Sequence, residues 1–254
     1  MDPSGALPGG EKPAIEEQAM IEITLDGRKV KAQEGSTLLS HIRARNIDLP
    51  TLCQHDELSP FGACRLCTVE VKVNGKWELA TACNTPVAKG MEVRTDSERA
   101  IAGRKLAASL LYYRYPATRA VRDLAEKLGI AVAAEAADAK ECVLCGLCTR
   151  TCREIVGVAA LSFEDRGLGR DVDEPRIAFD ANACIGCGSC AYVCPTGHVK
   201  METTGDKRII WDKAFKMATC QVCGRPFAPE DQLKYISART GVPMSRLKTC
   251  MSCR

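Results

Sequence analysis

Two stretches decide how this chain folds: CVLCGLCTRTC at residues 142–152 and CIGCGSCAYVCP at residues 184–195. Each obeys the spacing C-x2-C-x2-C-x3-C. In this spacing a short loop surrounds one iron–sulfur cube with three thiolates, whereas the fourth cysteine reaches the neighbouring cube from the following helix. The pattern predicts two [4Fe–4S] clusters, one bound by Cys142, Cys145, Cys148 and Cys194, the other by Cys152, Cys184, Cys187 and Cys190.

Glycines inside both loops favour the same interpretation. Gly146, Gly186 and Gly188 allow backbone N–H groups to approach the sulfurs, which tunes a cluster's potential. Pro195 follows the last cysteine, whereas Arg153 stands at the corresponding place in the first half. Two zinc sites are the alternative, but zinc ribbons use pairs of C-x2-C rather than such quartets. Residues 139–205 therefore resemble a two-[4Fe–4S] bacterial ferredoxin domain with an inserted hairpin.

The composition indicates that the other cysteines are ligands too. The 16 cysteines of this 254-residue chain fall into blocks of four, eight and four, with none left over. Neither a secretory signal nor a membrane span is recognisable, so we expect a cytoplasmic protein, in which thiols stay reduced. The net charge of +3 gives no reason to expect nucleic acid. Four deprotonated four-cysteine sites would bring it to about −5.

The N-terminal region predicts a small α+β sheet. Residues 20–32 alternate apolar and polar residues around Asp26-Gly27, and a second pair of strand-like runs flanks Asn74-Gly75, which are hairpin signatures. Between them, Ser36 or Thr37 is the expected N-cap of one helix. Two strands, a helix and two strands predict a sheet crossed by that helix.

The cysteines of this region follow Cys53-x10-Cys64-x2-Cys67-x15-Cys83. The stretch LPTLCQHDELSPFGACRLCTVEV, with ATACNTPVAKGMEVRT after it, resembles the [2Fe–2S] domain that begins the large electron-input subunit of respiratory complex I. It also resembles the small iron–sulfur (diaphorase) subunit of NAD-linked [NiFe] hydrogenases. The resemblance implies a β-grasp [2Fe–2S] ferredoxin domain over residues 20–97, bound by these four cysteines. A zinc site or a structural thiol set is the alternative.

The three histidines are expected to be non-ligands. A Rieske-type cluster uses two histidines, whereas His55 is the one candidate near the N-terminal cysteines, and four cysteines already suffice. We expect His55 to face solvent or to bond to backbone. We also expect His41 and His198 to be non-ligands.

The chain departs from these families between the two cluster domains. The complex I relatives usually hold a third cubane there with one histidine and three cysteines. Here the sequence has neither residue type between Cys83 and Cys142, and Tyr113-Arg114-Tyr115-Pro116 stands where His-Pro is expected. We predict a helical linker over residues 98–138, broken at Pro116, with that cluster lost. Either the two domains pack closer or their clusters serve different routes. Residues 1–19 are predicted to be a disordered tail.

The last block, Cys220-x2-Cys223-x26-Cys250-x2-Cys253, frames a helical stretch in residues 206–254. Gly224 after Cys223 is typical of a knuckle whose backbone N–H groups bond to the thiolates. We interpret the block as a structural zinc site, with a third [4Fe–4S] cluster as the main alternative and a regulatory thiol set behind it. Lys248 and Arg254 nearby are interpreted as solvated surface charges.

These features predict an electron-transfer subunit of a cytoplasmic NAD(P)-linked oxidoreductase. No G-x-G-x-x-G follows a strand, so we expect a flavin/NAD(P)-binding subunit and a catalytic subunit as partners. A [NiFe] hydrogenase, electron-bifurcating or not, is the first choice for the catalytic part, and soluble ferredoxin is a further partner of a branched route. The alternatives are a formate dehydrogenase complex, a free ferredoxin-like carrier and a redox-sensing regulatory protein.

Overall fold

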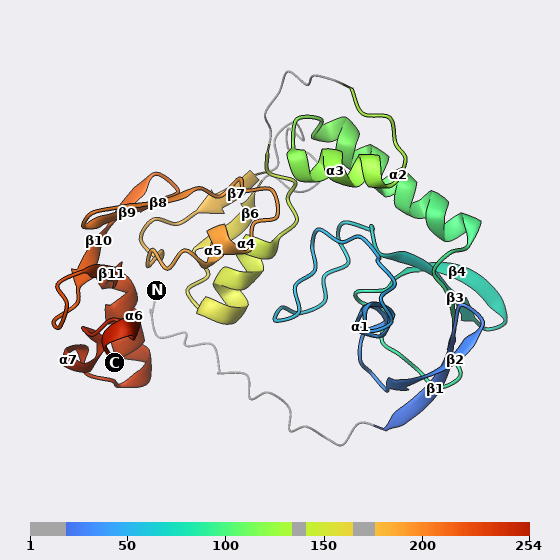
Figure 1. The fold of residues 1–254 in the computed structure, drawn as a ribbon, viewed down its shortest axis with the longest axis horizontal. Helices are drawn as coiled ribbons and strands as arrows, with labels where there is room; N and C mark the ends of the chain where they lie inside the picture. The colour runs from blue at the N-terminus through green and yellow to red at the C-terminus, as the bar shows by residue number, and fades with distance from the viewer. Residues whose placement is uncertain (1–18, 134–140, 165–175) are drawn as a thin grey trace. The chain divides into compact units, whose positions relative to one another are not determined.

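The computed structural model describes residues 19–133, 141–164 and 176–254 (Figure 1). The predicted disordered tail, apart from its last residue, lies outside the described residues, as do the end of the predicted linker and the glycine-rich turn of the inserted hairpin. The chain forms two compact units. The first holds residues up to Leu49 together with Cys67–Gly103, and the second holds Pro50–Leu66 together with Arg104–Arg254.

The first unit is a mixed five-stranded sheet around one helix. Its strands lie in the order β2-β1-β5-β3-β4, with β1 and β5 parallel and the other neighbours antiparallel. The elements are β1 (Met20–Leu25), β2 (Arg28–Gln33), α1 (Leu38–Arg43), β3 (Thr68–Val73), β4 (Lys76–Thr81) and β5 (Glu92–Arg94). This confirms the predicted α+β sheet, to which β5 adds a strand that the sequence did not predict.

Both predicted hairpins form with tight two-residue turns. Asp26 and Gly27 have φ of 48° and 76°, and Asn74 and Gly75 have φ of 50° and 79°. Two consecutive positive φ values define the type I′ turn, whose twist matches that of the strands it joins. The Asn/Asp-Gly pairs therefore set the register of β1 with β2 and of β3 with β4.

Helix α1 is held by its buried face and by a backbone cap. Leu38, Leu39 and Ile42 are at most 2% exposed and pack against the sheet, which encloses the helix in Figure 1. Thr37 occupies the N-cap position that the sequence allowed, but its side chain makes no capping bond. The Leu38 N–H instead donates to the Thr85 carbonyl at 2.9 Å. A distant backbone group thus replaces the local side-chain cap.

The linker helices are separated where Pro116 predicts a break. Helix α2 (Glu98–Arg114) begins in the first unit and continues into the second, and α3 (Arg119–Lys127) follows the proline. From Ala107 onward α2 packs with α3 around Ala108 and Leu124. None of the helices in the described part of the chain is both long and apolar enough to cross a membrane.

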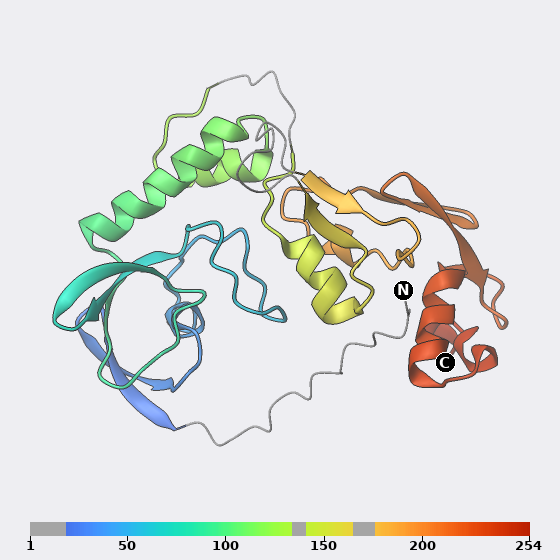
Figure 2. The same cartoon turned by 180° about the vertical axis from the view of Figure 1, so that it is seen from behind.

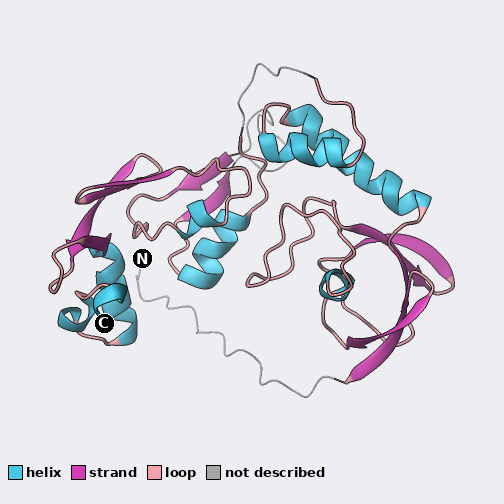
Figure 3. Ribbon diagram, in the orientation of Figure 1, coloured by secondary structure: helices cyan, strands magenta, loops and turns pink. Residues whose placement is uncertain are grey.

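The second unit carries the two remaining cysteine blocks. Figure 3 shows short helices in the first of them and a ribbon of strands leading to the C-terminal helices. The elements are α4 (Leu147–Arg150), the π-helix η1 (Thr151–Val156), β6 (Leu161–Glu164), β7 (Arg176–Phe179), α5 (Ser189–Tyr192), β8 (Met201–Thr204), β9 (Lys207–Ile210), β10 (Lys213–Thr219), β11 (Pro226–Pro229), α6 (Glu230–Thr240), α7 (Met244–Leu247) and the 3-10 turn η2 (Met251–Cys253).

Two small sheets support these helices. Strands β6 and β7 pair antiparallel, as the inserted hairpin predicts. Strands β8 to β11 form a sheet in the order β11-β10-β9-β8, and Figure 2 shows it running toward α6. The core of the C-terminal element is small, since it rests on Ala218, Leu233 and Leu247.

Candidate metal centres

The first cysteine motif lies on a loop that turns into a helix. Gly146, with φ of 76°, is the N-cap of α4, and α4 continues directly into η1. Cys148 and Cys152 are thus buried on one helical segment, at 8% and 9% exposure. The Cys152 carbonyl accepts a hydrogen bond from the Gly157 N–H at 2.9 Å, which closes the segment.

Cys194 lines one cavity together with Cys142, Cys145 and Cys148, and Cys152 packs in one cluster with Cys184 and Cys190. Burial raises the pKa of Cys145 to about 11 and that of Cys148 to about 12, and the charge of Cys194 adds to both. Burial also raises the pKa of Cys190 to about 11, and Cys152 contributes there. These interactions fit the crossed arrangement, and Cys148 also interacts with Cys190 of the other predicted cluster. The assignment of the eight cysteines as ligands stays a prediction.

Backbone N–H groups point at several of these sulfurs. The Leu144 N–H is directed at the Cys142 sulfur, and the Gly186 N–H at the Cys184 sulfur. Both oppose the pKa increase that burial causes. At Cys194 burial is outweighed by the N–H groups of Val199 and Thr196 and by the Thr196 hydroxyl, so the pKa is lowered. Such donors favour thiolates over thiols, as cluster ligation requires.

The second motif is fixed by residues that sequence reasoning missed. Arg208 on β9 donates to the carbonyls of Gly186 and Cys187 at 3.2 and 3.4 Å. Lys213 on β10 donates to the Cys184 carbonyl at 3.3 Å. These contacts join residues more than 20 positions apart, so no local sequence pattern could predict them. The β8–β11 sheet therefore holds the loop and adds two positive charges beside it.

Gly186 offers a test of this packing. It has φ of 70°, and a Cβ there would lie 2.6 Å from the ring of Phe215. Gly205 has φ of 56° with nothing within 4 Å, so it is a matched control for backbone strain alone. We expect Gly186→Ala to cost about 1–3 kcal/mol more than Gly205→Ala because of overpacking. Thermal unfolding and iron retention measure this, and equal losses in the two variants would contradict it.

The four N-terminal cysteines are divided between the two units. Cys67 and Cys83 are each 1% exposed in the core of the first unit. Cys53 and Cys64 belong to the second unit, where their sulfurs lie 3.3 Å apart. The hydrogen bond to Cys53, with burial, raises the pKa of Cys64. Each pair is thus buried or half-buried, and the joint role of the four stays a prediction.

The three histidines lie in different surroundings, and their role as non-ligands stays a prediction. His55 is exposed, and its Nδ1 accepts the Glu57 N–H at 3.2 Å. His41 bonds to the Ser36 hydroxyl at 2.6 Å, and burial lowers its pKa. The His198 ring lies edge-on to Trp211, with 6.2 Å between the centroids.

The segment that stands where His-Pro is expected has one buried tyrosine. Tyr115 is 5% exposed and lies in a core with Val121 and Val143. Beside it is a cavity of about 360 Å³ whose lining includes Cys64, Cys145 and Tyr115. One cysteine from each of two predicted clusters therefore faces the same cavity.

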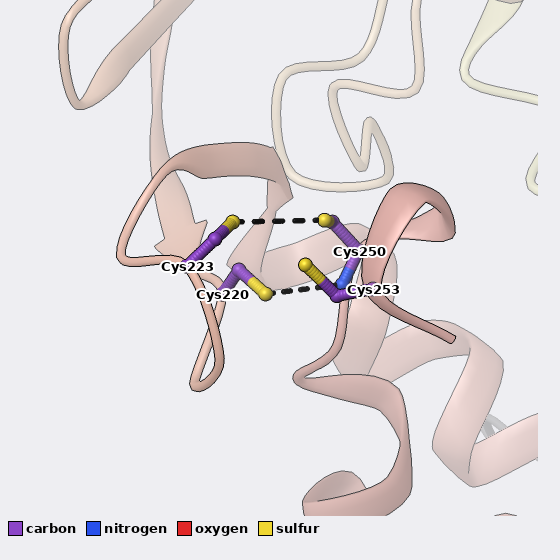
Figure 4. A group of neighbouring side chains, drawn as sticks. All are labelled: Cys220, Cys223, Cys250 and Cys253. Carbon is purple, nitrogen blue, oxygen red and sulfur yellow. Dashed lines mark hydrogen bonds between the residues drawn. The ribbon is translucent and has the colours of Figure 1, made fainter.

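The C-terminal cysteines form the tightest group (Figure 4). In the described part of the chain, Cys220, Cys223, Cys250 and Cys253 are the one set of three or more Cys, His, Asp or Glu whose ligand atoms all lie within 4.8 Å of one another. The Cys250 N–H donates to the Cys220 sulfur at 3.4 Å, and the sulfurs of Cys223 and Cys250 are 3.8 Å apart. Gly224 takes φ of 71°, as the predicted knuckle requires.

Hydrogen bonds prepare this group to bind a cation. The N–H groups of Cys250 and Cys223 lower the pKa of the Cys220 thiol to about 6. The backbone and guanidinium of Arg225 lower the pKa of Cys223, a contact that the sequence analysis missed. Cys253 shares hydrogen bonds with Cys250 and Cys223, which raise its pKa to about 12. A cation would release that last proton, because metal ligation requires thiolates.

Comparison with known families identifies both domains. Residues 18–98 match the 2Fe-2S iron-sulfur cluster binding domain, and residues 141–198 match the 4Fe-4S dicluster domain. The fold and the cysteine sites thus define an iron–sulfur protein with these two domains in succession. The predicted order of domains, followed by a four-cysteine group, is confirmed.

The chain is similar to subunits of redox enzymes. It is 31% identical to the NADPH-Fe(3+) oxidoreductase subunit alpha of Geobacter sulfurreducens, over 80% of this chain and 27% of that protein. It is 32% identical to the NADP-reducing hydrogenase subunit HndD of Solidesulfovibrio fructosivorans, over 70% of this chain and 36% of the other. A crystal structure of an NAD+-reducing [NiFe]-hydrogenase aligns with a TM-score of 0.52 and 26% identity, over 65% of this chain and 77% of that one.

The predicted resemblance is confirmed by these matches and by the mitochondrial NADH-ubiquinone oxidoreductase 78 kDa subunit of Candida albicans, which is 30% identical over 68% of this chain and 22% of that protein. A putative formate dehydrogenase of Staphylococcus aureus is 25% identical over 70% of this chain and 20% of its own length. The chain spans about a quarter to a third of the length of the first two curated relatives.

Proposed function

We propose that this chain is an electron-transfer subunit of a cytoplasmic NAD(P)-linked complex, placed between a flavin/NAD(P)-binding subunit and a catalytic subunit. The observation that carries the proposal is that the eight cysteines of the two motifs lie in one compact unit with the loop that holds Cys53 and Cys64. Bound at these cysteines, one [2Fe–2S] and two [4Fe–4S] clusters would supply one-electron transfer.

The chain's own residues fit such clusters. The quartets lie half-buried or buried, and backbone N–H groups are directed at their sulfurs. Within the described residues, neither quartet closes to the 4.8 Å spacing of the C-terminal group. This is expected of a cube, because each thiolate binds a different iron and the sulfurs stand further apart than around one ion.

The loss of the third cubane is consistent with a closer packing of the remaining clusters. The loop with Cys53 and Cys64 belongs to the same unit as the dicluster domain, and Cys64 and Cys145 line one cavity. Of the two possibilities left open by the sequence, this arrangement favours direct proximity over separate routes. Electron-transfer rates fall steeply with distance, so proximity compensates for a lost relay.

A hydrogenase is the catalytic partner that the comparisons favour. The NADP-reducing and NAD+-reducing hydrogenases among the relatives support it, and the same observations allow an electron-bifurcating complex with soluble ferredoxin as a further partner. The putative formate dehydrogenase supports the second candidate. Affinity purification under anaerobic conditions through a tag on this chain tests the proposal. Co-purifying flavin with NAD(P)H-dependent activity would support it, and a chain isolated alone would refute it.

For the C-terminal group we propose a structural zinc ion. Zn–S bonds of about 2.3 Å in a tetrahedron place the sulfurs about 3.8 Å apart. All four sulfurs lie within 4.8 Å of one another, and one pair is at 3.8 Å. This spacing suits a single ion better than a cube.

A metal count separates the alternatives. For the holo-chain purified without oxygen we expect about ten irons and one zinc. Elemental analysis by mass spectrometry, with acid-labile sulfide as an independent count of cluster sulfur, measures this. About fourteen irons without zinc would instead show a third cubane at the C-terminus.

A further inference from the structure

The loop Pro50–Leu66 is tied to the first cysteine motif by two charged side chains. Arg150, the last residue of α4, donates to the carbonyls of Cys53 and Ser59, both at 2.5 Å. Glu154 of η1 accepts the N–H and the hydroxyl of Ser59, both at 2.9 Å. These bonds join residues more than 90 positions apart in sequence, within a single compact unit.

An aromatic contact completes this attachment. The guanidinium of Arg150 lies 4.7 Å from the centre of the Phe61 ring, a cation–π arrangement. Phe61 also approaches Gly146 so closely that a Cβ there would lie 3.1 Å from the ring. The loop is therefore fixed at Cys53, Ser59 and Phe61, all of which precede Cys64 in the sequence.

Arg150 itself is buried and forms no ion pair with a described carboxylate. It is 3% exposed, and its Nε has no hydrogen-bond partner among the described residues. None of the carboxylates that the structure describes forms an ion pair with it. A buried cation needs a compensating negative charge. The carbonyls of Cys53 and Ser59 accept its hydrogen bonds but carry no net charge.

We propose that Arg150 is the shared counter-ion and positioning residue of the [2Fe–2S] cluster predicted at Cys53 and the [4Fe–4S] cluster predicted at Cys148. The inference rests on the cluster assignment of the proposed function, though not on the partner subunits. Four thiolates give each cluster site a negative charge, and Cys148 is two residues from Arg150. Reduction adds one electron to a cluster, so a fixed cation nearby stabilises the reduced form and raises the potential.

The test is a redox titration of the purified full-length holo-chain with dithionite as reductant, followed by EPR. We expect Arg150→Gln to shift the [2Fe–2S] potential in the negative direction, because it removes the charge while keeping a hydrogen-bond donor. Arg153→Gln is the matched control. Arg153 directly follows Cys152 of the same motif, but its side chain is 63% exposed. Solvent screens that charge, so its shift should be smaller and should shrink as salt is added.

A [2Fe–2S] potential in Arg150→Gln that moves no further than in Arg153→Gln, with iron content intact, would overturn the proposal. If Arg150→Gln does not retain the cluster, Arg150→Lys is the second variant, because it keeps the positive charge. Retention of iron by the lysine variant would support a requirement for charge, and equal loss would overturn it. Because no partner protein is used, failure here is distinguishable from failure of the proposed complex.

Discussion

Replacing Cys194 with alanine is expected to remove about four of ten irons and to leave the cluster bound by the second motif intact. The physical reason is the predicted crossed arrangement, which fits the cavity that Cys194 lines together with Cys142, Cys145 and Cys148. Iron content and the EPR signal of the reduced protein measure the loss, and the [2Fe–2S] signal serves as an internal standard.

Two double variants make this prediction sharper. Cys148→Ala combined with Cys194→Ala should lose no more iron than Cys194→Ala alone, because both residues belong to one site. Cys187→Ala combined with Cys194→Ala should lose both cubanes and keep about two irons. The reverse pattern, with the second pair losing only one cubane, would show that each motif binds its own cluster.

Replacing Cys220 with alanine is expected to release the zinc and to open the C-terminal element. Structural zinc contributes about 10–16 kcal/mol of apparent binding free energy in small zinc-dependent peptides. The core here rests on Ala218, Leu233 and Leu247 and is too small to replace such a contribution. Limited proteolysis should then cut between residues 220 and 254 much faster than in the parent chain, with zinc absent by elemental analysis.

The same variant should keep about ten irons, because the four C-terminal cysteines are separate from the predicted cluster ligands. Lys248→Ala is a suitable control, since Lys248 lies beside the second cysteine pair without being a proposed ligand. Protease resistance that survives the loss of zinc would show that the element folds without metal. Loss of four irons in place of zinc would indicate a cubane.

Local sequence signals predicted much of this fold. The two Asx-Gly turns lie at the tips of the predicted hairpins, Pro116 separates α2 from α3, and Gly224 takes the positive φ of a knuckle. Each of these signals depends on the conformational preference of one or two residues. The dicluster domain followed from cysteine spacing, which is equally local, whereas the [2Fe–2S] domain followed from a family resemblance.

Contacts between distant segments could not be predicted in this way. Strand β5 has only three residues and is defined by its neighbours β1 and β3. Arg150, Arg208 and Lys213 resemble ordinary basic residues in the sequence, and only the folded chain shows them on carbonyls of cysteine loops. A side chain whose role depends on residues distant in sequence produces no periodicity or spacing pattern from which that role could be predicted.

The most direct test of the proposed function is EPR of the anaerobically purified native complex, rapidly frozen after addition of NADH or NADPH. If this chain relays electrons from the nucleotide, one of the two nucleotides will reduce its clusters within catalytic turnover, and Cys194→Ala will remove one of the resulting signals. Clusters that dithionite reduces but neither nucleotide reduces, in a preparation with its flavin bound, would contradict the account.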